Sequence, residues 1–384
     1  MGSARTDRSD AWRDRITLGA LGAAAALFIG WLILRSAPSH VDPLAAVPVD
    51  SFLVATVDFA ALARSPLGGA LVGDGGARAG SLLDVTGVDT ITATCGFDPL
   101  HHVRAVAVAV PEGGENGDFG VAASEDLSRD ALAACTKALV AKRGGEANER
   151  RVGTFTVISD SHGGRDAEVA FRDGGPLLVG RGAWLTKMID AVEGRTPSVA
   201  GAGGEHRELR ADLAKRDLDA QAIEITATLP AAVRSRILGE MGGTSDRPNP
   251  VMASVLAVSR AVIGLHAGAA NDDTRIAAEL RCETEPACDE VSKVILHARL
   301  GWSGNLGYRL FGLGALIDNL QVRREGTTLI VQTRAPAEDL ARMLDKALNA
   351  PPRPKAPPAA PPAPPSAPAS AAGSNGGSRG DGGT

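Results

Sequence analysis

Aromatic residues are scarce in this chain of 384 residues, which has four Trp, one Tyr and eight Phe. Exposed aromatic rings are the side chains on which sugars and single-stranded nucleic acids stack. Basic residues are not concentrated either, because 40 Lys and Arg are spread along the chain beside 45 Asp and Glu. Nucleic-acid binding needs a concentrated basic surface that displaces counterions from phosphates. Composition therefore argues against both kinds of ligand.

Sequence motifs for metals and nucleotides are missing as well. The chain has no C-x-x-C pair and no His near a Cys in the spacing of zinc ligands. A glycine-rich stretch over residues 73–80 is not followed by the Lys-Ser or Lys-Thr of a phosphate loop. It is therefore interpreted as a connection between helices, and neither a metal nor a cofactor is expected.

Two short segments have residue types that enzymes use, but not in a catalytic pattern. Asp160, Ser161 and His162 are contiguous, whereas a hydrolase triad needs side chains that converge in space. His101 and His102 have no cluster of carboxylates or cysteines near them in the sequence. There is also no G-x-S-x-G elbow, so the sequence predicts no catalytic site.

The run from Ile16 to Leu34 has 19 residues without a charge. At about 1.5 Å per residue, a helix of this length crosses the roughly 30 Å hydrocarbon layer of a membrane. Arginines are concentrated before the run, so positive-inside bias places residues 1–15 in the cytoplasm. The residues predicted at the two membrane interfaces are Trp12, Trp31, Arg13, Arg15 and Arg35. We therefore expect a single-pass protein of the bacterial inner membrane whose bulk is periplasmic.

A cleaved signal peptide is the alternative interpretation of this run. Such peptides have a shorter apolar core, of about 7 to 15 residues, followed by a small-residue cleavage site. The sequence Arg35-Ser36-Ala37-Pro38 is a poor cleavage site, and no cysteine follows that could be lipidated. An uncleaved signal anchor is therefore favoured.

The end of the chain, residues 350–384, is rich first in Pro and Ala and then in Gly and Ser. A segment of this composition cannot offset its ordering entropy by burying apolar side chains. We expect a disordered tail whose Pro-rich part is a stiff spacer and whose Gly-rich part is flexible.

Between the anchor and the tail, two parts of the chain resemble each other at a spacing of 156 residues. The run RAVAVAV begins at Arg104 and RAVIGLH at Arg260, and 260 minus 104 is 156. Ser128 and Thr284, again 156 residues apart, have the position of an N-cap before a periodic apolar helix. These similarities predict an internal repeat of hairpins, each followed by a helix.

The repeat defines the expected fold. Each part opens with a strand that runs into a helix, FLVATVDFAALARSPLGGAL at Phe52 and AIEITATLPAAVRSRILGEM at Ala222. We predict an α+β protein in which the transmembrane helix is followed by two tandem related α+β units, residues 45–197 and 205–349. Each unit is expected to be a mainly antiparallel sheet with helices on one face.

Four cysteines lie in the part that is predicted to be outside the cytoplasm, where disulfides persist. Cys282 and Cys288 are at a strand end and in the first helical turn after it, which is a geometry that allows a bridge. Cys95 and Cys135 are the remaining pair. We predict both disulfides.

The glycine-rich run from Gly301 to Gly314 contains two of the few aromatic residues, Tyr308 and Phe311. Two interpretations are open, a partner-binding loop and ordinary irregular core packing.

The opening PVDSFLVATVDFAAL, the segment CGFDP and the strand RAVAVAVP resemble uncharacterised, Ala-rich, membrane-anchored envelope proteins of high-GC Gram-negative bacteria. The resemblance implies an envelope location and no particular activity. Together with the repeat, it leads us to expect a non-enzymatic envelope protein that binds or scaffolds a protein partner through strand edges or the loops between units. The alternatives are an anchored extracytoplasmic hydrolase or peptidase-like enzyme with an unrecognised site, and a sensor domain for a small apolar ligand.

Overall fold

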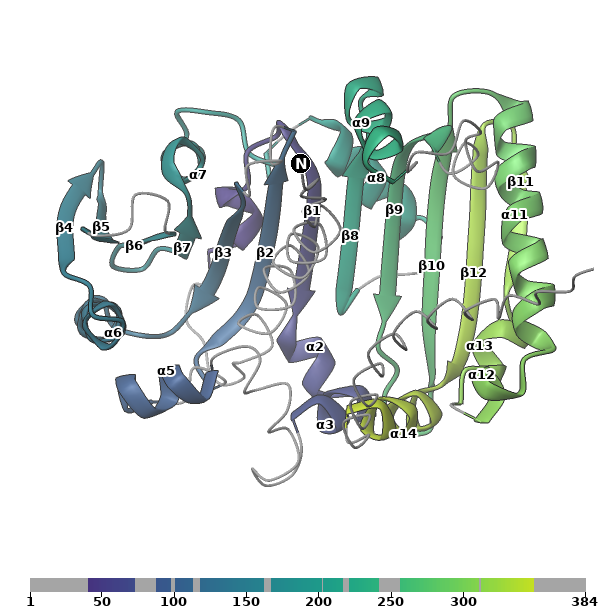
Figure 1. The fold of residues 1–384 in the computed structure, drawn as a ribbon, viewed down its shortest axis with the longest axis horizontal. Helices are drawn as coiled ribbons and strands as arrows, with labels where there is room; N and C mark the ends of the chain where they lie inside the picture. The colour runs from purple at the N-terminus through teal and green to yellow at the C-terminus, as the bar shows by residue number, and fades with distance from the viewer. Residues whose placement is uncertain are drawn as a thin grey trace, which may run out of the picture. The chain divides into compact units, whose positions relative to one another are not determined.

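One sheet of twelve strands organises the described part of the chain (Figure 1). The computed structural model describes residues 41–72, 88–97, 101–112, 118–161, 167–201, 203–216, 221–241, 256–310 and 312–348. The strand order is β11-β12-β10-β9-β8-β1-β2-β3-β7-β6-β5-β4, and all neighbouring strands pair antiparallel. The predicted α+β class with antiparallel strands and helices is therefore confirmed, but the strands of the two predicted units pair through β1 and β8 into one sheet and do not form two.

The strands are β1 (Ser51–Asp58), β2 (Val103–Pro111), β3 (Gly120–Glu125), β4 (Ala147–Val152), β5 (Phe155–Asp160), β6 (Glu168–Phe171), β7 (Leu177–Gly180), β8 (Ile223–Thr228), β9 (Val258–His266), β10 (Asp273–Cys282), β11 (Gln321–Glu325) and β12 (Thr328–Pro336). The helices are η1 (Pro43–Ala46), α2 (Phe59–Ala63), α3 (Pro66–Val72), α5 (Val88–Cys95), α6 (Arg129–Lys142), α7 (Gly182–Val192), α8 (Glu205–Ala214), α9 (Ala231–Met241), α11 (Glu285–Ser303), α12 (Leu306–Leu310), α13 (Gly314–Asp318) and α14 (Ala337–Leu348).

Polar side chains mark where helices begin. Asp58 ends β1 and accepts a hydrogen bond from the Ala61 amide, so α2 follows the strand without a loop. Ser128 caps α6 and Thr284 caps α11 in the same way. Each cap satisfies a backbone N–H that has no partner inside the helix. The predicted N-caps are therefore present at both positions.

Two sets of five strands have the same order in the sheet. The first is β1-β2-β3-β7-β6 and the second is β8-β9-β10-β12-β11. When the strands of each set are counted in chain order, the fifth strand, β7 or β12, lies between the third and the fourth. The sets meet where β1 pairs with β8 (Figure 1). An additional hairpin, β4 and β5, extends the first set at its edge.

Residues that are 156 positions apart in the two predicted units lie on opposite faces of the sheet. Val106 and Val262 are equivalent at this spacing, and they pair with Val57 and Thr226 respectively. Val57 also pairs with Ile223, which is three residues from Thr226 and therefore points to the opposite face. A difference of one residue turns a strand over. The shared RAV triplets are thus not structurally equivalent.

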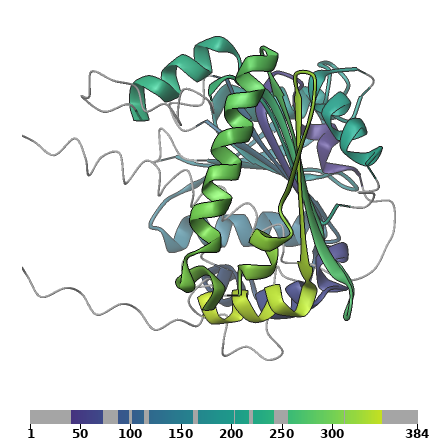
Figure 2. The same cartoon turned by 90° about the vertical axis from the view of Figure 1, so that its right-hand side faces the viewer.

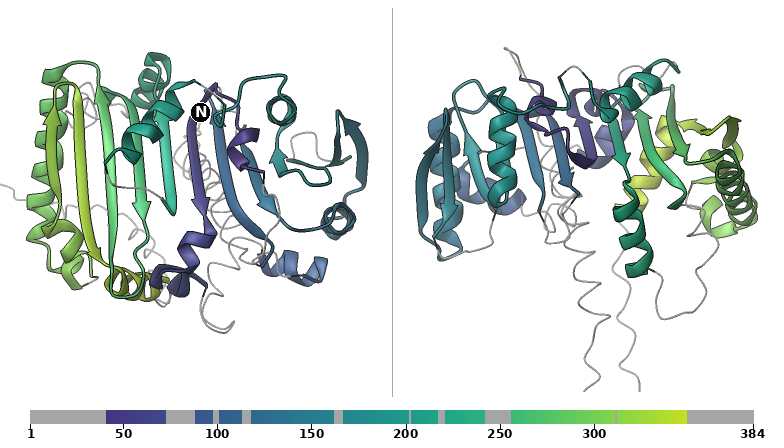
Figure 3. Two further views of the ribbon diagram at one scale, coloured as in Figure 1. Left: turned by 180° about the vertical axis from the view of Figure 1, so that it is seen from behind. Right: turned by 90° about the horizontal axis from the view of Figure 1, so that it is seen from above.

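Helices pack on both faces of the sheet, so the prediction of helices on one face is wrong. Leu209 of α8 packs on Val262, whereas Val291 of α11 packs on the opposite side, with Ala261. We call the side of α7 and α8 face A and the side of α6 and α11 face B. In Figure 2 α11 lies in green on one side of the strands, and in Figure 3 the view from behind has α8 in front of them. The reason is that strands such as VRAVAVAVP are apolar at successive positions, which leaves both faces to be covered.

Several predictions from the termini lie outside the described residues. These are the anchor 16–34 with Trp12, Trp31, Arg13, Arg15 and Arg35, and the tail 350–384. Within the described residues, no helix combines the length and the apolar character that crossing a membrane requires.

Candidate functional site: an apolar surface on helices α11 and α12

Helix α11 is fixed at its first turn. Thr284 accepts a hydrogen bond from the Ala287 amide at 3.3 Å, and a proline follows at the start of the helix, where it needs no hydrogen-bond partner. A disulfide joins Cys282 at the end of β10 to Cys288 in this turn. Cys288 and Val291 are the buried residues of the helix and pack on face B. The first half of α11 is therefore held by a cap, a disulfide and an apolar contact.

The second half of α11 is not buried in this way. After Val291, none of the residues up to Ser303 is fully buried. The helix has 19 residues and, at about 1.5 Å per residue, is roughly 28 Å long. Its last turns therefore extend past the apolar contact with the sheet, and they contact α12 and α13 instead.

Five large apolar side chains are exposed along these turns and α12. Their exposed fractions are 40% for Leu296, 71% for Leu300, 46% for Trp302, 69% for Leu306 and 38% for Tyr308. Leu296 and Leu300 are one helical turn apart and so are neighbours on one side of α11. The rings of Trp302 and Tyr308 pack edge to face with centroids 6.4 Å apart. We call these five residues together the apolar surface, in which Leu300 and Trp302, two positions apart on α11, face different sides of the helix. Single exposed apolar residues are normal, so five of them within 13 residues make this segment a candidate interaction site.

Hydrogen bonds from two arginines hold the backbone of this surface in place. Arg309 donates from Nε to the Ser303 carbonyl oxygen at 3.0 Å and pairs through Nη2 with Asp318 at 2.9 Å. Arg299 donates to the Asp318 carbonyl oxygen at 2.9 Å. The end of α11, α12 and α13 are therefore tied together, and the exposed side chains project from a braced segment.

The sequence interval that contains the apolar surface has one more basic than acidic residue. No Asp or Glu occurs between Glu290 and Asp318, whereas Lys293, Arg299 and Arg309 lie in this interval. Lys293 pairs with Glu290 at 2.6 Å and Arg309 with Asp318 at 2.9 Å. The hydrogen bond with Glu290 raises the pKa of Lys293. Residues 290–318 thus have three cationic and two anionic side chains, a net charge of +1 with His297 neutral, in a chain whose net charge is -5.

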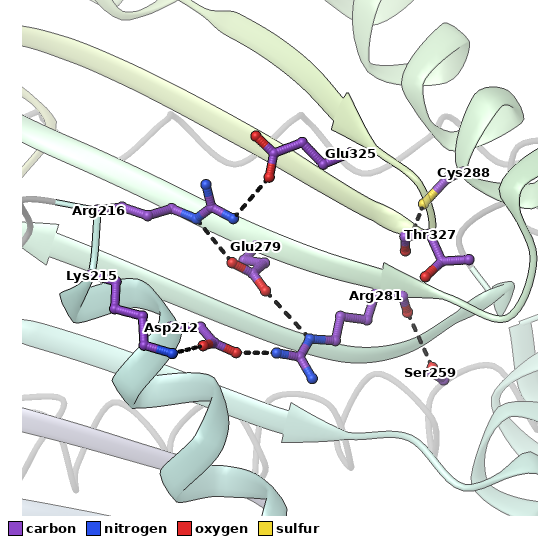
Figure 4. Close-up of polar contacts among 9 residues, drawn as sticks. All are labelled: Asp212, Lys215, Arg216, Ser259, Glu279, Arg281, Cys288, Glu325 and Thr327. Carbon is purple, nitrogen blue, oxygen red and sulfur yellow. Dashed lines mark hydrogen bonds and ion pairs between the residues drawn. The ribbon is translucent and has the colours of Figure 1, made fainter.

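A second polar cluster lies on face A, beneath α8 (Figure 4). The Glu279 carboxylate on β10 is 2% exposed and receives Arg216 Nε at 3.1 Å and Arg281 Nε at 3.3 Å. Arg281 also pairs with Asp212, and Arg216 with Glu325 at 3.4 Å. Lys215 donates to Asp212 at 2.8 Å, and this hydrogen bond is the main reason that the pKa of Asp212 is lowered.

Every charge of this cluster has a partner of opposite sign. Asp212, Glu279 and Glu325 face Lys215, Arg216 and Arg281, and Glu325 also pairs with the exposed Arg323 at 2.9 Å. A buried carboxylate needs such partners because desolvation of an unpaired charge is costly. Each charge is engaged in holding α8 on the sheet, so the cluster has a structural explanation and does not require a ligand.

A buried histidine continues the polar contact between α8 and the sheet. The Nε2 of His206 lies 2.7 Å from the Ser51 carbonyl oxygen, so this nitrogen carries the proton and donates. Its Nδ1 is 2.8 Å from Thr226 Oγ1 and accepts from that hydroxyl in the neutral ring. Burial lowers the pKa of His206. The side chain therefore connects α8 to both β1 and β8 where the two strand sets meet.

The pair of histidines before β2 acquires a carboxylate partner that the sequence did not reveal. His102 Nδ1 lies 2.7 Å from Asp126 Oδ1, across the hairpin of β2 and β3. Phe97 packs edge to face on the His102 ring. Burial raises the pKa of the neighbouring Glu125 to about 7, and the charge of Asp126 adds to the shift. The 24 residues that separate His102 from Asp126 explain why sequence inspection missed the contact.

Both predicted disulfides are present in the structure. Cys95 at the end of α5 is bonded to Cys135 of α6, and Cys282 to Cys288. The Cys288 sulfur lies 3.2 Å from the Thr327 carbonyl oxygen, a contact drawn in Figure 4. A disulfide sulfur has no proton to donate, so this contact is close packing and not a conventional hydrogen bond.

The other candidates from the sequence have mixed outcomes. Asp160 ends β5 and Ser161 follows it, while His162 lies outside the described residues, as do residues 73–80. The run from Gly301 to Gly314 includes three of the five residues of the apolar surface. Leu296 and Leu300 were missed, although their outward position on a periodic helix was a usable signal. No group of three or more His, Cys, Asp or Glu that could hold a metal is found among the described residues.

No family model matches the chain, and no curated protein matches it either. Two solved structures of TP0453 have a weak structural similarity to this chain. Its crystal form I is 12% identical with a TM-score of 0.41, covering 81% of this chain and 100% of that one. Its crystal form IV is 13% identical with a TM-score of 0.42, covering 79% and 97%. These values are too low to support a conclusion about activity or partners.

Proposed function

We propose that this is a non-enzymatic binding protein of the bacterial cell envelope, anchored through residues 16–34 and binding through the apolar surface. The observation that supports it is the exposure, between 38% and 71%, of five large apolar side chains within 13 residues, 296–308. Leaving them in water is unfavourable by about 25 cal/mol for each Å² of apolar surface. A partner that covers the surface removes this cost.

The sheet edges are poor candidates for the binding surface. The edge strand β4 exposes Glu149, Arg150 and Arg151, and the edge strand β11 exposes Arg323 and Arg324. Charged side chains on an edge strand oppose the addition of a further strand. Of the two routes expected from the sequence, strand edges and loops, the exposed side chains favour the helix and loop segment of α11 and α12.

The envelope location is supported by the disulfides. Both bonds require an oxidising compartment to persist, and the periplasm is one. An inner-membrane anchor with a periplasmic bulk is consistent with that chemistry. A protein partner in the envelope stays a prediction of the sequence.

We also infer that the two strand sets descend from one repeated unit, with residues 45–197 and 205–349 as its copies. The identical strand order and the matching N-caps of α6 and α11 support this inference. The reversed faces of the hairpins β2–β3 and β9–β10 require that a one-residue shift accompanied the divergence.

Site-specific photo-crosslinking in the native membrane tests the proposed binding surface. A photoreactive amino acid at Leu306 of the full chain should form covalent adducts with the bound partner, because this side chain is exposed and belongs to the apolar surface. The matched control places the same amino acid at Val49, an exposed apolar residue before β1. Adduct formation at Leu306 no greater than at Val49 would contradict the proposal.

One observation favours the enzymatic alternative. A histidine paired with a carboxylate, His102 with Asp126, beside a Glu125 whose pKa is about 7, is a combination found at acid-base sites. If the protein is an anchored hydrolase or peptidase-like enzyme that uses this pair, ester or peptide substrates should be cleaved by the full chain. Asp126→Asn should then reduce the rate without unfolding the protein. Equal background rates for both proteins across such substrates would contradict this alternative.

A further inference from the structure

We propose that face A of the second strand set binds an oxyanion with two negative charges, such as a phosphate group, where β9 ends, β10 begins and β12 ends. Three side chains form the site, which are His266, Arg275 and Arg334, and we call them the basic row. The basic row contains no residue of the apolar surface on α11 and α12. The inference therefore goes beyond the proposed function and is tested independently of it.

The register of the sheet places the three side chains next to one another. His266 of β9 pairs directly with Arg275 of β10, and Arg275 pairs on its other side with Arg334 of β12. Directly paired residues point to the same face, with Cβ atoms about 5 Å apart. Val262 lies four residues before His266 and packs under α8, so the two-residue period of β9 puts His266 on face A as well. The basic row is therefore one patch on one face.

The contact of α8 with the sheet ends beside the basic row. Leu213 of α8 is in one apolar cluster with Ala277, the next residue of β10 on face A after Arg275. Seen from behind in Figure 3, α8 crosses in front of the upper part of these strands and leaves their lower part in view. Arg275 is exposed, the Arg334 side chain is 68% exposed, and His266 is half-buried. A ligand can therefore reach the basic row from solvent.

The charges of the basic row are not balanced within the described part of the chain. Neither the Arg275 guanidinium nor the His266 ring has a polar partner among the described residues. Arg334 Nε lies 3.8 Å from Asp273 Oδ2, which is a long ion pair. Two guanidinium groups thus have one carboxylate near them. Like charges directly opposite each other on paired strands are unfavourable, and an anion bound between them removes this cost.

Other arginines of face A differ, because each has a carboxylate partner. Arg216 and Arg281 both bond to Glu279 (Figure 4), and Arg323 pairs with Glu325 at 2.9 Å. These arginines have an explanation within the fold. Arg275 has none, so its position opposite a second arginine points to a ligand.

The donors of the basic row match a phosphate better than a carboxylate. Each guanidinium presents a planar fork of N–H donors that fits two oxygens of an oxyanion. The neutral His266 ring donates from one nitrogen, and the Gln332 amide lies two residues before Arg334 on the same face. A phosphate monoester has a charge of about -1.5 to -2 at pH 7, close to the opposite of two guanidinium charges. A single carboxylate has one charge and two oxygens, which occupy only one fork.

Binding of inorganic phosphate to the full chain in detergent micelles tests the site. Ionic strength is held constant with chloride, and the width of the phosphate resonance in phosphorus NMR reports the bound fraction. The wild type should broaden this resonance. Arg275→Gln and Arg334→Gln should each weaken binding about tenfold, because each removes a charge-assisted fork. Arg275→Lys should weaken it less, because the charge stays and only the fork is lost.

Arg323→Gln is the matched control. Its side chain is 68% exposed, as is that of Arg334, and it lies on the same face, but it has Glu325 as a partner. Phosphate binding should be unchanged in this variant. Thermal unfolding in chloride shows whether the variants fold, and Arg275→Gln should unfold at the wild-type temperature or slightly above it, because it removes a repulsion. A clearly lower temperature would assign Arg275 to the support of the fold and overturn the site.

Two further probes identify the class of ligand. Methyl phosphate that binds as tightly as inorganic phosphate supports a phosphate monoester, whereas binding of inorganic phosphate alone supports the free anion. Acetate should bind at least about tenfold more weakly than either, because it fills one fork. Acetate binding equal to phosphate binding, no broadening with the wild type, broadening that persists in Arg275→Gln, or broadening lost in Arg323→Gln would each overturn the site. None of these results changes the crosslinking expected at Leu306, so the proposed function stands or fails separately.

Discussion

The two strand sets have the same order but cover face A with helices of different chemistry. In the first set α7 buries Trp184, Leu185, Met188 and Ile189, a continuous apolar contact. In the second set α8 buries two leucines and is otherwise held by His206 and by ion pairs. A shared strand topology therefore does not require a shared way of attaching a helix to it. The first contact should be insensitive to salt and pH, and the second should respond to both.

The two sets also differ in the loops that their disulfides close. The bond Cys95–Cys135 joins residues 40 apart in the sequence, and Cys282–Cys288 joins residues 6 apart. Chain entropy predicts that the longer loop stabilises by about 4 kcal/mol and the shorter by about 2 kcal/mol. Replacing each pair by alanines and measuring denaturant unfolding of the full chain should show this order. Under reducing conditions, which open every remaining disulfide, this difference between the two variants should disappear. A larger loss of unfolding free energy for the variant without Cys282–Cys288 would contradict the predicted order of the two disulfides.

The contrast between α7 and α8 can be tested by one substitution in each contact. Leu185→Ala should cost about 3 kcal/mol at any salt concentration, because it removes buried apolar volume. Glu279→Gln should cost about 2 kcal/mol, less than for a fully buried pair, because Arg216 and Arg281 are each about a quarter exposed. Salt should reduce the second cost by screening the two remaining guanidinium groups from each other.

Arg323→Gln serves as the control in this comparison, since it removes an exposed charge from an edge strand and should change stability by less than about 0.5 kcal/mol. Equal salt dependence of Leu185→Ala and Glu279→Gln, measured by unfolding of the full chain, would show that α7 and α8 are attached by the same kind of interaction.

Local signals in the sequence were sufficient for the strands, the caps and the cysteine pairs. Ser128 and Thr284 precede periodic apolar helices, and a cap is read from its immediate neighbours. The faces of the sheet were predicted wrongly because they depend on register, which a single residue reverses. The pair of His102 with Asp126 depends on a hairpin contact that no local pattern shows.

The apolar surface was only partly predicted, for a related reason. Tyr308 stood out because it is one of the few aromatic residues and lies in the glycine-rich run from Gly301 to Gly314. Leu296 and Leu300 are apolar like core residues, but they lie on a different side of α11 from Cys288 and Val291, the residues that pack on the sheet. The helical period indicates this outward position, but whether another element covers that side is a property of the tertiary structure.

The smallest expected effects are on the pH dependence of stability, and they have opposite signs in the two sets. Burial lowers the pKa of His206 below its ordinary value of 6.5, so the unfolded chain binds the proton more tightly. Its contribution to stability is present above pH 6.5 and is lost as pH falls below that value. Glu125, in the first set, has its pKa raised from 4.5 to about 7, so its contribution is present below pH 4.5 and is lost as pH rises towards 7.

Unfolding of the full chain, measured from below pH 4.5 to above pH 7, should resolve the two contributions. His206→Asn should remove the decrease in the free energy of unfolding that occurs as the pH falls below 6.5. Glu125→Gln should remove the decrease in the free energy of unfolding that occurs as the pH rises from 4.5 towards 7. Solvent screening makes this decrease smaller than for a fully buried carboxyl, because Glu125 is incompletely buried. If His206→Asn leaves the free energy of unfolding below pH 6.5 unchanged, protonation of the His206 ring does not destabilise the folded chain. The second set would then owe its pH response to the carboxylates of its ion pairs, with Asp212, whose pKa is lowered by its partners, as the next group to test.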